Sequence, residues 1–169
     1  LCLVFETGSP KEDGGSRFVT SRKGMARFEI DIQGIAAHSG VAKDQGVSAA
    51  LEAAHQIIAI EALNDSSLGN TVTVGTVQSG TTANTVPEFA KLQIDCRFID
   101  PAQGEVLRDE IRRIANNPST RQSTALVAPK VELTELCGHE PFVRTDAIER
   151  MANRIIDWGA DLGLNLEEE

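Results

Sequence analysis

The feature of this sequence that most constrains its fold is a regular change between two hydrophobic periods. Apolar residues that alternate with polar ones are typical of half-buried strands, whereas apolar residues spaced by three and four are typical of amphipathic helices. The alternating period covers 24–33, 71–78, 89–99 and 125–136. The helical period covers 46–63 and 101–116. The elements therefore follow in the order strand, helix, strand, strand, helix, strand.

This order predicts an α+β fold, a ferredoxin-like β-α-β-β-α-β sandwich in which two helices cover one face of a four-stranded antiparallel sheet. The third strand has the clearest pattern, because four apolar residues alternate with four polar ones between Lys91 and Phe98. The second helix has a clear start. Asp100 supplies an N-cap, Pro101 suits the first helical position, and Gln103 suits a capping box.

A two-fold homodimer is predicted from the helix 46–63 and the strand 71–78. The apolar residues of the helix fall on a first face with Leu51, Ala54 and Ile58, and on a second face with Ala49, Ala53 and Ile60. The strand lies at an edge of such a sheet, and an exposed edge is normally covered or paired. Pairing of this edge with its copy in a second protomer is expected to bury the second face of the helix.

Both ends of the chain lie outside the predicted sandwich. The apolar run Leu1–Phe5 reads as a buried strand, and 145–162 reads as a further amphipathic helix. We therefore predict three segments: 1–13 and 137–169 as fragments of another domain, and 14–136 as the sandwich. We expect the chain to be cut from a longer protein. Any signal peptide lies upstream of Leu1, and we assign the protein to the cytoplasm.

Composition excludes two classes of partner. The chain has 16 basic and 25 acidic residues, a net charge of −9, which argues against binding of nucleic acid. Aromatic residues make up only 4% and there is no Tyr, so stacking surfaces for bases are poorly supplied. The apolar stretches are far shorter than the ~18 residues of a spanning helix, which predicts a soluble protein without a membrane partner.

The cysteines and two of the histidines are interpreted as structural. Cys2, Cys96 and Cys137 show no CxxC spacing and each lies beside apolar residues, which favours buried reduced thiols over a disulfide framework or a metal site. His55 lies within the first helix, and His139 lies in a loop without neighbouring ligand residues. Both are expected to be structural rather than metal ligands.

Four places in the chain have side chains suited to chemistry. His38 lies in a loop of small residues; Asn84 lies in the turn-rich segment 80–87; Arg97 lies on the polar face of a strand; Glu6 ends an apolar strand. Each also has a plainer interpretation: a surface histidine, a turn, an ion pair of Arg97 with Asp95 or Glu29, and a lone carboxylate. A guanidinium suits a substrate carboxylate because it offers a fork of donors.

The ordered set of motifs resembles the zinc-dependent amidohydrolase and exopeptidase family that includes glutamate carboxypeptidase, acetylornithine deacetylase and succinyl-diaminopimelate desuccinylase. The matching segments are Val4-Phe5-Glu6-Thr7, Arg22-Lys23-Gly24, Gly34-Ile35-Ala36-Ala37-His38-Ser39-Gly40, Gly46-Val47-Ser48-Ala49, Gly80-xxx-Asn84-xx-Pro87 and Asp95-Cys96-Arg97. The resemblance implies a ferredoxin-like lid and dimerisation domain inserted into a catalytic domain that holds two zinc ions.

The resemblance also implies roles for the candidate residues. Glu6 matches a zinc ligand, and His38 matches a lid histidine that enters the partner protomer's active site and polarises the scissile carbonyl. Asn84 and Arg97 match residues that hold the substrate's carboxylate. Gly80, with Gly40, would let the loops approach the ligand closely. The implied substrate is a small peptide or an N-acyl amino acid, cleaved next to a free carboxylate.

The remaining metal ligands and the general base of that family lie outside this chain. A zinc ion needs three or more protein ligands, so we expect the 169-residue chain to be inactive and to bind no stoichiometric zinc. The alternative is a free-standing ferredoxin-like module for dimerisation or small-ligand binding. In that case 80–87 is a ligand loop and His38 has no catalytic role.

Overall fold

The computed structural model describes residues 12, 14–122 and 126–169. They form two compact units, which we call the sheet unit, Gly24–Glu140, and the terminal unit, composed of the described residues up to Lys23 together with Pro141–Glu169. The sheet unit begins at 24 rather than at the predicted 14, and ends at 140 rather than 136. The predicted strand Leu1–Phe5, Glu6 and Cys2 lie outside the described residues.

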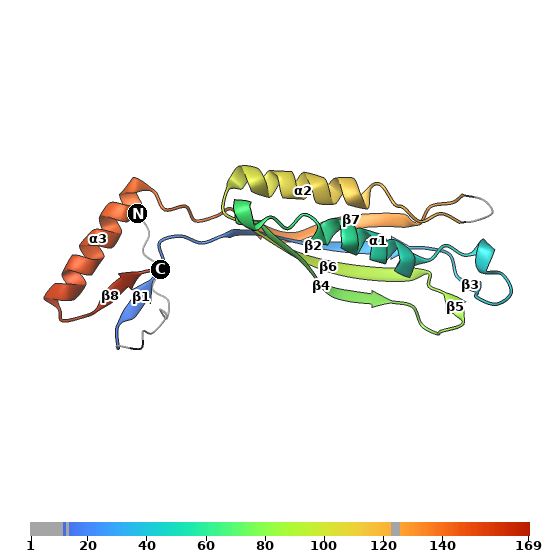
Figure 1. Ribbon diagram of the computed structural model, residues 1–169, viewed down its shortest axis with the longest axis horizontal. Coiled ribbons are helices and arrows are strands. Elements are labelled where there is room, and N and C mark those ends of the chain that lie inside the picture. Colours follow the sequence, from blue (N-terminus) through green and yellow to red (C-terminus); the bar gives the residue numbers. More distant parts are fainter. Residues whose placement is uncertain (1–11, 13, 123–125) are drawn as a thin grey trace. The chain divides into compact units, whose positions relative to one another are not determined.

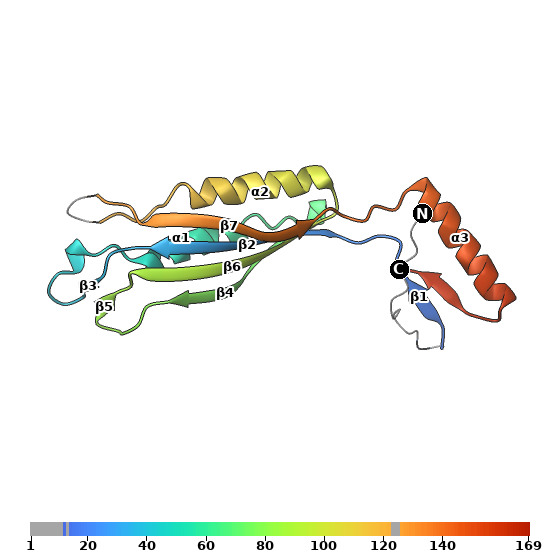
Figure 2. The same ribbon diagram turned by 180° about the vertical axis from the view of Figure 1, so that it is seen from behind.

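The sheet unit has the predicted ferredoxin-like architecture (Figures 1 and 2). Its strands lie in the order β4 (Thr71–Ser79), β6 (Phe89–Phe98), β2 (Gly24–Gln33) and β7 (Lys130–His139), and every neighbouring pair is antiparallel. The helices α1 (Ala49–Glu61) and α2 (Pro101–Ala115) pack on the same face, α1 mainly over β4 and β6, α2 over β2 and β7. The predicted edge position of the strand 71–78 is confirmed.

The core lies between this sheet and the two helices. β2 and β6 pair without interruption from Gly24 opposite Phe98 to Gln33 opposite Phe89, so their inward side chains form adjacent rows. These rows are at most 2% exposed and consist of Ala26, Phe28, Ile30 and Ile32 on β2, and Ala90, Leu92, Ile94, Cys96 and Phe98 on β6. Full burial of one large apolar side chain stabilises a fold by about 1.5–3 kcal/mol, so this ladder anchors the unit.

Helix α1 begins one residue after Ser48, whose hydroxyl accepts a hydrogen bond from the Leu51 amide. The predicted pair of apolar faces is present, but the assignment of the faces was wrong. Ala49, Ala53 and Ile60 are at most 2% exposed and face the sheet, because the small alanines allow close packing. The first face, with Leu51 and Ile58, is the exposed one.

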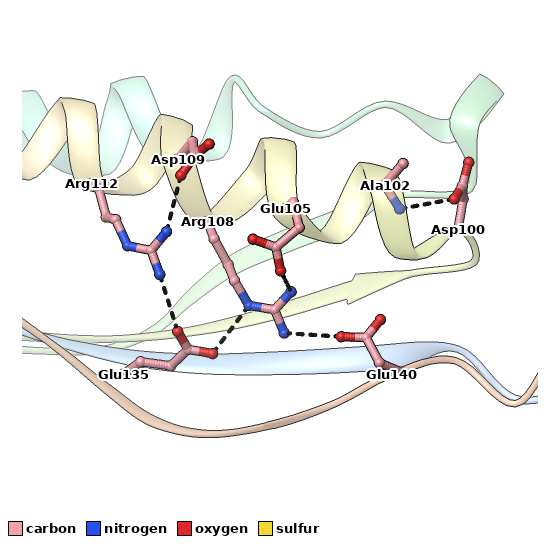
Figure 3. Close-up of polar contacts among 8 residues, drawn as sticks. All are labelled: Asp100, Ala102, Glu105, Arg108, Asp109, Arg112, Glu135 and Glu140. Carbon is pink, nitrogen blue, oxygen red and sulfur yellow. Dashed lines mark hydrogen bonds and ion pairs between the residues drawn. The ribbon is translucent and has the colours of Figure 1, made fainter.

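Helix α2 begins as the sequence predicts. The Asp100 side chain accepts from the Ala102 amide at 2.9 Å, and Pro101 occupies the first turn (Figure 3). The Gln103 side chain accepts from Asn70 instead of closing a capping box. Gly104 lies where α2 approaches the sheet most closely, since a Cβ atom there would stand 2.6 Å from the ring of Phe98.

The strand β7 is the second edge of the sheet. It begins at Lys130 rather than near the predicted 125 and continues to His139. Beyond Thr134 all of its residues are exposed, so the prediction of a buried thiol is wrong for Cys137 and right for Cys96. The physical reason is register, since Cys137 pairs with Arg27 on the face that no helix covers.

An ion-pair cluster joins α2 to the end of β7 (Figure 3). The Arg108 guanidinium lies over the Phe98 ring at 5.4 Å from its centre and reaches Glu105 at 2.9 Å and Glu135 at 3.1 Å. Glu140 lies 3.8 Å from the same guanidinium. Burial lowers the pKa of Arg108, but these carboxylates outweigh it and the net shift is upward. Arg108 thus holds the chain where it leaves the sheet unit.

The terminal unit is a small helix and strand assembly. β1 (Ser16–Phe18) pairs in parallel with β8 (Leu166–Glu168), and α3 (Asp146–Asp161) precedes β8. The Thr145 side chain caps α3, and Gly163 follows the helix with a φ of +73°. The remaining short elements belong to the sheet unit: β3 (Ala37–His38), η1 (Lys43–Gln45), η2 (Ser66–Leu68) and β5 (Thr85–Val86).

Replacement of Gly104 by Ala tests the close approach of α2. Alanine is the better helix former by about 1 kcal/mol, yet its methyl group collides with the fully buried Phe98 ring. We expect Gly104→Ala to lower the free energy of unfolding by about 1–2 kcal/mol in urea denaturation. The control Val106→Ala, at an exposed position of the same helix, should be neutral or slightly stabilising. A Gly104→Ala chain as stable as the wild type would contradict the packing argument.

Candidate functional site

The predicted histidine loop and the predicted turn segment meet at one end of the sheet unit, which we call the tip (residues 34–48 and 80–88). β3 pairs with β5 so that His38 lies opposite Thr85, and the Ser39 amide donates to the Asn84 carbonyl at 3.0 Å. The tip lies at the opposite end of the sheet from the start of β2 (Figure 1). Two segments 45 residues apart in the chain are thereby brought together.

The tip leaves His38 exposed and orients its ring. The Nδ1 atom accepts a hydrogen bond from the Gly40 amide at 3.1 Å. A ring nitrogen that accepts carries no proton, so in the neutral ring the proton lies on Nε2. His38 therefore presents an N–H donor to solvent or to a partner molecule. Such a donor suits an oxygen atom that gains negative charge.

Asn84 and Gly80 lie in the same turn region. Asn84 is exposed, and its side chain makes no hydrogen bond to any other described residue. Gly80 has a φ of +73°, a conformation that glycine adopts without strain, and its amide donates to the Phe89 carbonyl. The turn itself therefore accounts for the glycine at 80, independently of any ligand.

Arg97 lies at the other end of the sheet from His38 and Asn84. It pairs with Met25 next to the residue where the chain enters β2, whereas the turn 80–88 leads into β6 at Phe89. Eight strand residues separate Phe89 from Arg97, which at ~3.3 Å per residue is about 26 Å. One copy of the sheet unit therefore does not bring Arg97 to the same small ligand as Asn84.

The arginine end carries a compact charged cluster on the uncovered sheet face. Asp95 accepts from Arg97 Nε at 2.6 Å and Nη2 at 3.1 Å, and from Arg27 Nε at 2.9 Å. The plainer interpretation of Arg97, an ion pair with Asp95, is therefore present. Glu29 instead binds Lys91, at 2.5 Å. Two guanidinium groups around one carboxylate leave a net positive charge, which is compatible with an anionic ligand.

These contacts determine the protonation of Asp95. Burial acts to raise the pKa of this carboxyl, but the hydrogen bonds from Arg97 and Arg27 act in the opposite direction and prevail. The pKa of Asp95 is therefore below its usual range, and the carboxylate remains charged at neutral pH. Burial also raises the pKa of the Cys96 thiol to about 12, which makes it an inert core residue.

An open hollow of about 640 Å³ lies beside the helix α1 at the tip. It is lined by Ser39, Gly40, Val41, Lys43, Asp44, Gly46, Ser48, Leu51, Thr85, Val86, Pro87, Thr120 and Arg121. Its lining combines backbone of both tip segments with the two cations Lys43 and Arg121. The segment around Thr120 was not a sequence prediction, because nothing in its composition indicates that it returns to the tip.

The described residues hold no cluster of three or more His, Cys, Asp or Glu that could bind a metal ion. Glu6, the predicted zinc ligand, lies outside them. His55 is exposed on α1, and His139 lies at the end of β7 with its Nδ1 3.0 Å from the Glu140 carbonyl oxygen. Neither has metal-ligand neighbours within the part of the chain that the structure describes.

Sequence reasoning missed one buried acidic residue, Glu52. It is fully buried in α1, and its carboxylate accepts hydrogen bonds from the backbone amides of Ser119 and Thr120. In the sequence it looks like an ordinary surface glutamate of a helix. No local signal reveals its partners, which lie 67 and 68 residues further along the chain.

The fold and the tip together define a class of protein, and comparison with known families agrees. Residues 20–122 match the family of peptidase dimerisation domains, designated M20_dimer. The match covers more than half of the chain, so the chain belongs to this family. The match covers α1, α2 and the three strands β2, β4 and β6.

Two curated relatives are hydrolases. The chain is 30% identical over 108 residues to a p-aminobenzoyl-glutamate hydrolase homolog of Haemophilus influenzae, covering 62% of this chain and 26% of that protein. It is 36% identical over 85 residues to the indole-3-acetyl-aspartic acid hydrolase of Enterobacter agglomerans, covering 50% of this chain and 19% of that protein. The chain thus spans about a quarter or less of these relatives.

Solved structures share the fold. A tripeptidase from Staphylococcus aureus superimposes with a TM-score of 0.68 at 20% identity, covering 90% of this chain and 39% of that one. The aminopeptidase PepT from Bacillus cereus gives a TM-score of 0.67 at 20% identity, covering 95% and 41%. At this identity the likeness concerns the fold. No helix within the described ranges is long and apolar enough to cross a membrane.

Replacement of Asp95 by Asn tests the charged cluster through pH. Because the folded-state pKa of Asp95 is depressed, its stabilising contribution is present above the unfolded value of ~3.9 and is lost as pH falls through the folded value. We expect Asp95→Asn to cost about 1 kcal/mol of unfolding free energy at pH 7, a figure already reduced for solvent screening.

The difference between wild type and Asp95→Asn should shrink towards zero between about pH 4 and pH 2, measured by urea denaturation at each pH. The control Asp109→Asn removes an exposed carboxylate paired with Arg112 and should cost less than about 0.5 kcal/mol at either pH. An Asp95→Asn effect that is equal at both pH values would exclude the depressed pKa.

Proposed function

We propose that this chain is the lid and dimerisation portion of a di-zinc hydrolase that cleaves a peptide or N-acyl amide bond next to a free carboxylate. The family membership and the two hydrolase relatives support the hydrolase class. In this proposal His38 donates its Nε2–H to the carbonyl oxygen of the scissile bond while negative charge develops there. Asn84 and Arg97 bind polar groups of the substrate.

The separation of the two candidate ends carries this proposal. His38 and Asn84 share the exposed tip, whereas Arg97 lies about 26 Å away along β6 at the end where the chain enters the sheet. A small substrate that contacts all three residues therefore needs two copies of the sheet unit. The tip of one protomer would meet the arginine end of its partner at one active site, and a two-fold dimer forms two such sites.

The surface that would join the two protomers is exposed and apolar. Leu51 and Ile58 on α1 are 51% and 71% exposed, and Val77 on the edge strand β4 is 53% exposed. The outer edge of β4 has no strand neighbour among the described residues. Pairing of two β4 edges would satisfy their backbone groups and bury both α1 faces, which supports the proposed homodimer.

The proposed zinc site lies outside the described residues. By resemblance Glu6 supplies one ligand, and the other ligands and the general base come from outside this chain. Bound zinc would supply Lewis-acid activation of the amide and of water. The described residues do not form a metal site, so their part is confined to substrate binding, charge stabilisation and contact between protomers.

The names of the relatives support the substrate class. One is a homolog of a hydrolase of p-aminobenzoyl-glutamate, and another is a hydrolase of indole-3-acetyl-aspartic acid. Both names describe an acyl group on an amino acid with more than one carboxylate. The net positive cluster of Arg97, Arg27 and Asp95 suits the carboxylate of such a substrate. A free-standing ligand-binding module, in contrast, has no use for an arginine cluster so far from the tip.

Replacement of Ile58 by Glu tests the dimer surface. A buried unpaired charge is costly, so the substitution should shift the chain from dimer to monomer in sedimentation velocity, with at least about a hundredfold weaker association. The control Val106→Glu changes a residue of α2 that is also exposed, at 53%. It should leave association unchanged. Equal effects of both substitutions would exclude the α1 surface as the interface.

A mixed-dimer experiment tests the shared active site. In the full-length hydrolase, His38→Ala and Glu6→Ala should each be inactive, because one lacks the tip donor and the other a metal ligand. Random exchange of protomers restores one complete site in half of the dimers, so about a quarter of the wild-type activity should return on mixing. No recovery, with exchange verified by mass spectrometry, would contradict the contribution of His38 to the partner's site.

A further inference from the structure

The buried carboxylate of Glu52 has a role that neither the core nor the proposed chemistry explains. It is fully buried, and its Oε2 atom accepts from the backbone amides of Ser119 at 2.9 Å and Thr120 at 2.7 Å. Its Oε1 atom accepts from Gln56 Nε2 at 2.9 Å. An unpaired buried carboxylate is strongly unfavourable, and these three donors are what make its burial tolerable.

The two backbone amides belong to a segment without helix or strand. Residues 118–122 follow α2, and Thr120 is only 6% exposed. Amides in such a segment have no ladder partner, and buried amides without acceptors are rare in folded proteins. Glu52 therefore supplies from α1 the acceptors that regular secondary structure would otherwise supply. It determines where this segment lies.

From this segment a chain of hydrogen bonds continues to the histidine loop. Gln122 donates from its side chain to the carbonyl of Gln45 in η1. The Gln45 amide donates to Ala42 at 3.0 Å, and the Ala42 amide donates to the His38 carbonyl at 2.9 Å. Thr120 and Arg121 also line the same hollow as Ser39 and Gly40. The segment thus supports the His38 loop from one side.

We propose that Glu52 is a positioning residue for His38, acting through the segment 118–122 and η1. The carboxylate holds the segment by two backbone amides, and the segment holds the loop that orients the imidazole. The consequence for catalysis rests on the proposed function of His38, but the mechanical link does not. It is therefore measured on the 169-residue chain without substrate or metal.

The test compares two substitutions at Glu52. Methionine has a similar length and no acceptor, whereas glutamine keeps one oxygen for the two amides. The glutamine Nε2 would face Gln56, whose Oε1 has no partner among the described residues and is able to accept after rotation of its amide. Glu52→Met should accelerate hydrogen exchange at Ser119 and Thr120 by between about tenfold and a hundredfold, while Glu52→Gln remains near wild type.

The positioning role predicts a second effect in the same samples. In Glu52→Met the NMR order parameters of residues 39–42 should fall below about 0.6, from values near 0.85 in the wild type and in Glu52→Gln. The matched control is Glu61→Met. Glu61 accepts from the Val74 amide at 2.7 Å at the other end of α1. Its replacement should affect Val74 and leave residues 39–42 unchanged.

Two results would overturn the proposal. In the first, the amides of Ser119 and Thr120 are released while residues 39–42 keep their order. In the second, exchange increases equally along β2 and β6, which makes Glu52 a residue of global stability. If Glu52→Met does not fold, Gln122→Ala cuts the same link further along and should mobilise residues 39–42 alone. Activity of the full-length hydrolase remains a separate measurement, so failure of either idea is recognised independently.

Discussion

The antiparallel pairing of β2 with β6 is the interaction on which the rest of the sheet unit depends. It is continuous over ten residue pairs, and its inward rows supply most of the buried core against α1 and α2. The same ladder separates the two ends of the unit by its length. The histidine tip lies at one end and the Arg97 cluster at the other, so the rigid pairing that stabilises the fold also keeps the candidate residues apart.

This separation relates the dimer to the proposed chemistry. A single sheet unit offers a hydrogen-bond donor at the tip and a cationic cluster at the far end, and neither alone resembles a complete site. Two units joined through the exposed α1 face and the β4 edge would combine one end of each. In this view dimerisation assembles the active site, rather than only adding stability to two complete enzymes.

Buried polar groups position the loops that the core does not reach. Arg108 joins α2 to the end of β7 through Glu135 and Glu140, and Glu52 joins α1 to the segment after α2. Both side chains are charged, and both are surrounded by partners that satisfy them. Hydrophobic packing holds the centre of the unit without regard to direction, whereas these hydrogen bonds specify where individual backbone segments lie.

The sequence by itself determined the element order, the helix starts at Ser48 and Asp100, and the edge position of the strand 71–78, because hydrophobic period and caps are local properties. It also indicated His38, Asn84 and Arg97 as candidates. Only the tertiary structure decided which α1 face is exposed, that Cys137 lies open on β7, and that Arg97 lies far from the tip. It alone revealed the partners of Glu52. These outcomes depend on register and on contacts between residues distant in the chain, which no local pattern encodes.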